Sequence, residues 1–300
     1  PIFFVLRDGR QIVSLMPFME ISSPLTGRRG AFLPFTDFCD PFGAGGEFLK
    51  VAAEAVIAYG ERANWRYAEW RTTGVFLRPD KSSGTYLTHD IDLTRSEQEL
   101  NTSLKDSNRR NIRMAAKEGV AVRFERSIEA LTAFYRLHSL TRRKHGLPPQ
   151  PFFFFKKILD EILDRDHGVI ASAVLSHNVI ASSIYFHFGP KVVFKYGASD
   201  VSSLAYRPNN LLMWESIRWY KARGATGMNL GRSAIGNEGL RRYKRSWGAY
   251  ENPLYYQRFD FRKGVYIDVP LRGDSPRAWI SIMPIGLLRI AGRLFYKHAG

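Results

Sequence analysis

The chain has 300 residues, of which 45% are hydrophobic and 24% charged, a composition typical of a globular protein large enough for two domains with their own cores. Lysine and arginine number 44 against 28 aspartates and glutamates, so the net charge of +16 favours phosphates, nucleic acid or an anionic membrane surface as partners. Cys39 is the single cysteine, no apolar run reaches the roughly 18 residues of a membrane span, and no signal-peptide pattern opens the chain. These features argue against secreted disulfide-rich and membrane-spanning classes and favour a reducing, cytoplasmic setting.

The first hundred residues predict a hairpin, a strand, a helix and two further strands. The hairpin turns at Asp8-Gly9, a dipeptide that favours tight turns. The segments in chain order are "IFFVLRDGRQIVSLMPFMEI", "GAFLPF", "EFLKVAAEAVIAYGERA", "WRYAEWRTT" and "GTYLTHDIDL". A connecting helix, "SLKDSNRRNIRMAAKEGV", ends at Gly119. Because the chain begins inside a strand pattern, we expect a further N-terminal segment ahead of Pro1.

The remaining sequence predicts the same order again, preceded by two helices over about 127–144 and 152–165 with a proline-rich linker between them. Two β-branched runs separated by "SHN" predict an antiparallel hairpin. The segments that follow are the strand "KVVFKYGAS", a helix containing "YRPNNLLMWESIRW", the short strand in "GMNLGRS", the helix "GNEGLRRYKRSWG" and the strand "ENPLYYQRFDF".

The repeated order predicts the α/β (α+β) class, with two copies of one architecture, each a mixed, mostly antiparallel sheet flanked by helices. We expect domains at residues 1–98, which would lack its opening helices, and 99–262. Residues 263–300 form a C-terminal amphipathic tail, which either docks on the body or lies in an anionic membrane interface.

The connecting helix carries Lys105, Arg109, Arg113 and Lys117 at intervals of four residues, so these side chains share one face. Such a face could follow a polyphosphate or RNA backbone, or it could be an ordinary solvated helix face.

The segment "KYGASDVSSLAYRPNNLL" predicts a strand that leads through a loop to a helix with Pro208 at its first position. The unpaired N–H groups of the first turn favour the binding of an anion. The Arg207 guanidinium can donate two hydrogen bonds to a phosphate, and Asn209 and Asn210 can orient that phosphate. The alternative is that Pro208 and the asparagines merely start a helix.

The helix "GLRRYKRSWG" places Lys244 among aromatic residues, where its ammonium could neutralise a developing oxyanion and Tyr243 could donate a proton. Alternatively, Tyr243 and Trp247, four residues apart, are core anchors with the charges outside. Arg232 follows a short strand and is expected to face the same cleft.

Two further patterns give weaker signals. Asp90 and Asp92 in "HDID" have the spacing of an Asp-x-Asp metal clamp, but strand alternation puts both on one solvent face. The seven histidines lack metal-ligand spacing, so we predict no metal site.

The stretches "SLKDSNRRNIRMAAKEGV", "LTRRKHGLPPQPFFFF", "YGASDVSSLAYRPNNLLMW", "LGRS" and "GLRRYKRSWG" resemble the FemAB-related branch of the GNAT acyltransferases. They are most similar to GNAT-like proteins associated with exopolysaccharide loci of the PEP-CTERM type and with cellulose biosynthesis. The resemblance covers about residues 1–260 and implies tandem GNAT-like domains.

The resemblance also implies site residues. Lys244 matches the lysine of the aromatic-Lys-x-x-aromatic-Gly pattern, which sits at the transfer site, and Tyr243 precedes it. Arg207 to Asn210 occupy the pyrophosphate-loop position without the family's glycines. The expected donor-binding set is Tyr196, Ser199, Arg207, Asn209, Asn210 and Arg232, and the expected acceptor-binding set is Asp37, Asp40, Lys105, Arg109 and Arg113.

The function that the resemblance implies is transfer of an acyl or aminoacyl group from acyl-CoA or aminoacyl-tRNA to an amine or hydroxyl of an envelope polysaccharide or peptidoglycan precursor. No tightly bound cofactor is expected. The choice between acyl-CoA and aminoacyl-tRNA as donor is left open, because this sequence has neither the CoA-binding glycines nor the coiled-coil arm of tRNA-dependent relatives. The alternative is a non-catalytic GNAT-fold protein that binds RNA or an anionic membrane surface.

Overall fold

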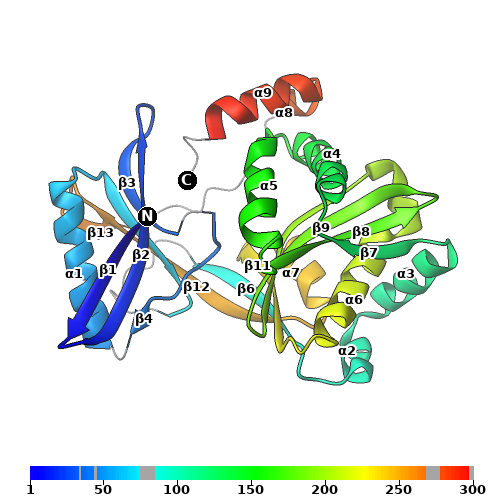
Figure 1. The fold of residues 1–300 in the computed structure, drawn as a ribbon, viewed down its shortest axis with the longest axis horizontal. Coiled ribbons are helices and arrows are strands. Elements are labelled where there is room, and N and C mark those ends of the chain that lie inside the picture. The colour runs from blue at the N-terminus through cyan, green and yellow to red at the C-terminus, as the bar shows by residue number, and fades with distance from the viewer. Residues whose placement is uncertain (34, 44–45, 75–84, 268–277, 297–300) are drawn as a thin grey trace.

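A computed structural model describes residues 1–33, 35–43, 46–74, 85–267 and 278–296. A mixed sheet runs through the molecule in the order β1-β2-β3-β5-β12-β6-β11-β10-β9-β8-β7, with β4 paired to β2 and β13 to β12 (Figure 1). The strands are β1 Ile2–Asp8, β2 Gln11–Ser23, β3 Gly27–Phe32, β4 Phe42–Gly43, β5 Tyr67–Thr72, β6 Thr85–Asp92, β7 Ala121–Glu125, β8 Gly168–Leu175, β9 Asn178–Phe188, β10 Lys191–Ser199, β11 Gly227–Ala234, β12 Tyr250–Asp260 and β13 Val265–Ile267.

Helices cover both faces of the second-half sheet and one face of the first. The helices are α1 Gly46–Arg62, α2 Glu97–Ser103, α3 Asp106–Lys117, α4 Ile128–Lys144, α5 Phe152–Ile158, α6 Pro208–Lys221, α7 Glu238–Arg245, α8 Ala278–Ser281 and α9 Ile285–Phe295, with a π-helical turn at Leu159–Leu163 and a 3₁₀ turn at Val201–Tyr206. The strands β8 and β9 are buried between the α4–α5 pair and the α3–α6 pair, which is why they read as nearly continuous apolar runs.

Both predicted hairpins form: β1 pairs with β2 and β8 with β9, each antiparallel. The expected helix over 152–165 is α5 followed by the π-helical turn, and α2 was not expected as a separate helix. Ser96 and Glu99 form a capping box at its start, with Glu99 N–H donating to Ser96 Oγ at 3.2 Å.

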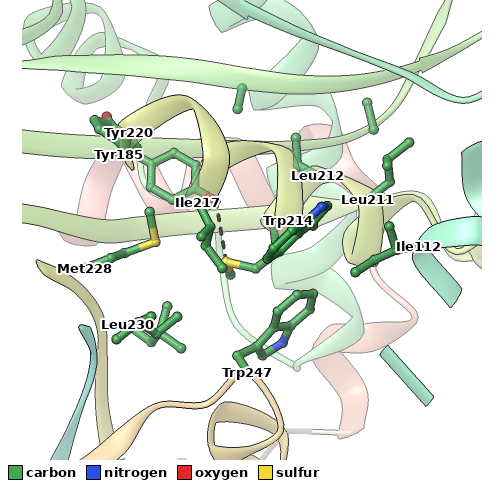
Figure 2. Packing of buried hydrophobic residues seen from close by; sticks show 14 of the residues in the cluster. Ile112, Tyr185, Leu211, Leu212, Trp214, Ile217, Tyr220, Met228, Leu230 and Trp247 are labelled. Carbon is green, nitrogen blue, oxygen red and sulfur yellow. Dashed lines mark hydrogen bonds between the residues drawn. The ribbon is translucent and has the colours of Figure 1, made fainter. Parts of the chain in front are cut away.

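The largest core cluster lies beneath α6. Trp214 and Ile217 of α6 meet Met228 and Leu230 of β11, and Trp247 closes the cluster from the segment after α7 (Figure 2). This packing fixes α6 against β11, and therefore fixes where the start of α6 lies relative to the sheet.

The sheet continues across the predicted domain boundary at residues 98 and 99. β12 pairs with β5 on one side and with β6 on the other, and β6 in turn pairs with β11. The two halves are thus joined through β12 and β6 (Figure 1). The boundaries of the two domains and the tail stay predictions.

Candidate active site where two strands part

The parallel strands β10 and β11 pair over only three positions and then part. Lys191, Val192 and Val193 pair with residues 227–229. Beyond them β10 shifts register between Phe194 and Tyr196, while β11 shifts after Asn229 and turns through Gly231 at a φ of +76°. We call the place where the two strands part the opening, and backbone groups that lose their ladder partner at such strand edges are available to a ligand.

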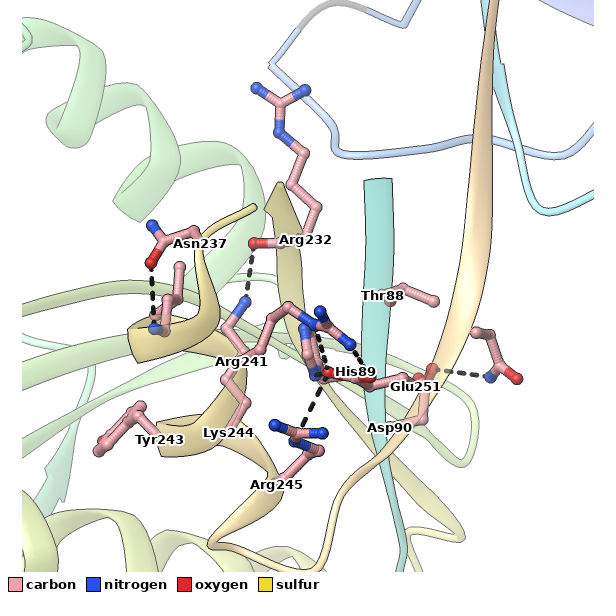
Figure 3. Close-up of polar contacts among 12 residues, drawn as sticks. Thr88, His89, Asp90, Arg232, Asn237, Arg241, Tyr243, Lys244, Arg245 and Glu251 are labelled. Atoms are coloured by element: carbon pink, nitrogen blue, oxygen red, sulfur yellow. Dashed lines mark hydrogen bonds and ion pairs between the residues drawn. The ribbon is translucent and has the colours of Figure 1, made fainter. Parts of the chain in front are cut away.

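Lys244 reaches this opening from α7. Its side chain is buried, and its Nζ donates to the carbonyls of Gly231 and Arg232, each at 2.8 Å (Figure 3). Burial lowers the pKa of Lys244 to about 8, and the nearby Arg232 acts in the same direction while Asp37 opposes it. An ammonium group therefore lies at the bulged edge of β11.

Ion pairs hold α7 in place. The Arg241 guanidinium donates two hydrogen bonds to the carboxylate of Glu251 on β12, from Nε at 3.0 Å and from Nη2 at 2.9 Å. Asn237 caps the helix by accepting from the Leu240 N–H. His89, fully buried on β6, lies 3.8 Å from Glu251, and burial together with Lys244 lowers its pKa to about 4. A neutral His89 beside Lys244 avoids a second buried cation.

Asp37 comes from the loop after β3 to meet Arg232 of β11. Its carboxylate accepts the Arg232 N–H at 3.1 Å and lies 3.7 Å from the guanidinium. Arg232 also donates to the Tyr256 hydroxyl at 2.7 Å and lies over the rings of Tyr86 and Tyr256, at 4.5 and 5.3 Å from their centroids. Asp37 thereby connects the loop after β3, in the first half of the chain, to the opening at β11 in the second half.

Lys195, which was not among the residues expected at the site, lies in the register shift of β10. Its Nζ donates to the Phe35 carbonyl, and burial lowers its pKa. A lysine inside an otherwise apolar strand segment, "KVVFKYGAS", was the available signal. Lys195, Arg232 and Lys244 thus bring three cations to the opening around Asp37.

The start of α6 has the predicted polar character. Arg207 has a left-handed φ of 53° directly before Pro208. Asn209 donates to Ser199 Oγ at 3.2 Å. Asn210 donates at 3.2 Å to Asn108 of α3, whose own amide donates to Ser246. Arg207, Ser199, Asn209 and Asn210 therefore lie together at one helix start.

Tyr196 lies apart from that helix start. Its ring packs edge-on against Phe155, with centroids 5.2 Å apart, and at a tilt against Phe134, with centroids 6.4 Å apart. Burial raises the pKa of Tyr196, so its hydroxyl stays protonated.

Several expected acceptor residues have structural contacts. Asp40 accepts both the N–H and the hydroxyl of Thr73 at 2.7 Å. Arg109 donates to three carbonyls at the end of α2, so it caps that helix. Lys105, the N-cap residue of α3, and Arg113 on α3 are both exposed.

Tyr243 is 44% exposed, with its ring edge-on to Trp247, and points away from Lys244 (Figure 3).

Asp90 and Asp92 share one face of β6, as strand alternation predicts, but that face lines a pocket of about 490 Å³. Its other polar walls are Lys191, Asn229 and Tyr250. The Asn229 amide donates to Asp90 at 2.7 Å, and its oxygen accepts the Gly231 N–H at 2.8 Å. Phe38, next to Asp37, also lines the pocket. The pocket therefore adjoins the Lys244 opening in two places, along β11 and along the loop after β3.

Within the described ranges, no three His, Cys, Asp or Glu side chains gather as a metal-ligand group. Among the same residues, no helix combines the length and the apolar character that crossing a bilayer requires.

Residues 103–245 match the family model of the acetyltransferase (GNAT) domain. Similar solved structures include FemX, with a TM-score of 0.68 and 12% identity over 86% of this chain and 87% of that chain. The C-terminal domain of a putative lysylphosphatidylglycerol synthetase from Agrobacterium fabrum has a TM-score of 0.56 and 13% identity over 81% and 80%. A tandem GNAT protein from the clavulanic acid biosynthesis pathway has a TM-score of 0.56 and 10% identity over 85% and 81%. A comparison with curated protein sequences gives no match. The expected fold class is confirmed: the chain is α/β with a mixed sheet and a tandem GNAT-like fold.

Proposed function

We propose that the protein is an acyl- or aminoacyltransferase whose transfer site is the opening between β10 and β11. The observation that carries this proposal is the buried Lys244 ammonium at the bulged edge of β11, 2.8 Å from the carbonyl oxygens of Gly231 and Arg232. A fixed cation in a partly dry site stabilises negative charge far better than one in water. The GNAT match over residues 103–245 supports the same reaction class.

In the proposed reaction, an amine or hydroxyl of the acceptor attacks the carbonyl carbon of a thioester or ester donor. The new N–C or O–C bond forms first and gives a tetrahedral oxyanion, whose collapse breaks the bond to the donor sulfur or oxygen; the acceptor proton leaves on the departing group. Lys244 neutralises the tetrahedral oxyanion, while Arg207, Asn209 and the start of α6 hold the donor phosphates. Acyl-CoA and aminoacyl-tRNA both carry such phosphates.

The pocket beside Asp90 and Asp92 is suited to the acceptor, because carboxylates and an aromatic wall at Tyr250 attract an ammonium group. The name of one similar structure, a putative lysylphosphatidylglycerol synthetase, describes a phospholipid that carries a lysyl group. We therefore propose an envelope polysaccharide, peptidoglycan or related precursor as acceptor and the cytoplasm as the place of reaction.

The test is mass spectrometry of candidate acceptors incubated with the protein and either a panel of acyl-CoA thioesters or charged tRNA. We expect Lys244→Met to lower turnover by about 10²–10³-fold, the effect of removing one oxyanion donor. The matched control is Arg242→Met, an exposed cation on the same helix, which should keep turnover within about threefold.

Circular dichroism and thermal unfolding would verify that both variants fold. Turnover of a folded Lys244→Met at the wild-type rate would refute the role of Lys244. Absence of product with every donor, together with steeply salt-dependent polyanion binding, would instead favour a non-catalytic binding protein.

A further inference from the structure

The C-terminal helix α9 is held against the body by one face. Leu288 is 2% exposed, and Gly292 packs so closely that a Cβ there would stand 2.0 Å from the Pro149 carbonyl oxygen. Arg289 donates to Ser139 Oγ of α4 at 3.2 Å and lies over the Tyr135 ring. These contacts with α4 and the linker fix the rotation of α9 about its own axis.

The opposite face of α9 is apolar and exposed. Leu287, Ile290 and Leu294 are 52%, 58% and 58% exposed, and their spacing of three and four residues puts them on one stripe. Phe295 borders the stripe at 59%, and Ile282, between α8 and α9, is 83% exposed. In Figure 1 this helix lies at the outer edge of the molecule, above α4 and α5.

The surroundings of the stripe are basic. In the described residues 278–296 the charged residues are Arg289 and Arg293, both cations, and residues 130–157, which include most of α4, contain six lysines and arginines and no acidic residue. Arg293 is exposed on α9, and the last turn of α4 carries Arg142, Arg143 and Lys144. The helix that carries the apolar stripe therefore packs on α4, whose last turn has three cations.

We propose that α9 is a membrane-docking helix that lies in the headgroup region of an anionic phospholipid bilayer. The apolar stripe of Leu287, Ile290 and Leu294 would enter the acyl boundary, and the surrounding cations would contact lipid phosphates. RNA or an acidic protein would use the cations but leave the stripe in water. A second copy of the chain would cover the stripe but bring two basic regions together. A bilayer of anionic lipid satisfies both features at once.

The experiment is sedimentation of the full chain with large vesicles of phosphatidylcholine alone or of phosphatidylcholine with phosphatidylglycerol in equal parts. We expect binding to the anionic vesicles that weakens with salt and is at least ~10-fold weaker on the neutral ones. The triple variant Leu287→Ser, Ile290→Ser and Leu294→Ser should reduce the partition coefficient by roughly 10-fold or more, because it removes the buried apolar area but no charge.

The matched control replaces Leu25 and Phe188, which are 68% and 80% exposed elsewhere, by serine and should leave binding unchanged. Equal loss of binding in the control, equal binding to both vesicle types, or no vesicle binding by the wild-type chain would overturn the proposal. So would light scattering that shows a dimer of the wild-type chain which the triple variant abolishes. None of these readouts depends on acyl transfer, so this proposal and the proposed function can fail separately.

Discussion

Through Lys244, a rise in pH should lower the activity of the protein and raise its stability. The Lys244 pKa of about 8 lies below the ordinary 10.5, because burial disfavours the charged form. If the ammonium stabilises the oxyanion, turnover should fall as the pH rises through about 8. Between pH 8 and 10.5 the unfolded chain binds more protons at this site than the folded chain, so the contribution of Lys244 to stability should rise by ~3 kcal/mol at most.

The measurement is a pH profile of kcat/KM together with urea unfolding of the wild-type chain and Lys244→Met at each pH. Subtracting the free energy of unfolding of the variant from that of the wild-type chain at each pH removes the contribution of the other lysines and tyrosines. A wild-type turnover that increases above pH 8 would show that the neutral amine acts, as a base, and would contradict the proposed oxyanion role.

Local sequence physics left two interpretations of Lys244 open, and the physical reason lies in its neighbours. Tyr243 and Trp247 are four residues apart and contact each other, so the helix "GLRRYKRSWG" was also consistent with core anchors and charges outside. The family motif favoured Lys244 as a site residue. Lys195 joins the site at the register shift of β10, and side-chain periodicity does not predict where a bulge falls.

At the scale of single elements, the start of α6 combines backbone strain with a proposed binding role. Arg207 has the left-handed conformation, which costs a residue with a side chain about 1 kcal/mol relative to glycine. We expect Arg207→Gly to leave the free energy of unfolding unchanged or raise it by less than ~1 kcal/mol, while the KM for the donor rises by about 10-fold. Urea unfolding and steady-state kinetics would measure the two effects.

Asn64 supplies the matched control, because it has the same φ of 53° but follows α1, in the other half of the chain. Asn64→Gly should affect stability similarly and leave the KM for the donor unchanged. A KM for the donor that Arg207→Gly does not alter would show that the arginine side chain does not hold the donor.

Elements with a strong hydrophobic pattern were predicted correctly, and α2, whose pattern is weak, was not. The hairpin of β8 and β9 formed as predicted because both strands are buried on two faces. The helix α2 has one buried side chain, Leu100, in seven residues, so no apolar stripe marked it. Its capping box at Ser96 and Glu99 was the readable signal.

At the scale of the whole molecule, the partners of β12 could not be predicted from the sequence. Strand patterning gives the buried face of a strand, but not which strands lie beside it. β12 follows α7 in the chain, yet it pairs with β5 and β6, and Glu69 of β5 contacts Arg258 of β12 as well as Arg71. Although burial alone would raise it, the two arginines hold the pKa of Glu69 below its ordinary range. The two halves are therefore tied by the sheet and by a buried charge cluster.

This connection predicts that the two halves unfold as one cooperative unit. Glu69→Gln should lower the free energy of unfolding by ~3 kcal/mol, because it leaves two arginines in a largely buried site without their counter-charge. Hydrogen exchange should show the loss equally at the slowest amides of β5 and of β9, which lie in different halves. If only the amides around β5 exchanged faster while those of β9 kept their protection, the halves would be independent units. The calorimetric and van't Hoff enthalpies of the wild-type chain would then disagree, whereas a single cooperative unit requires that they match.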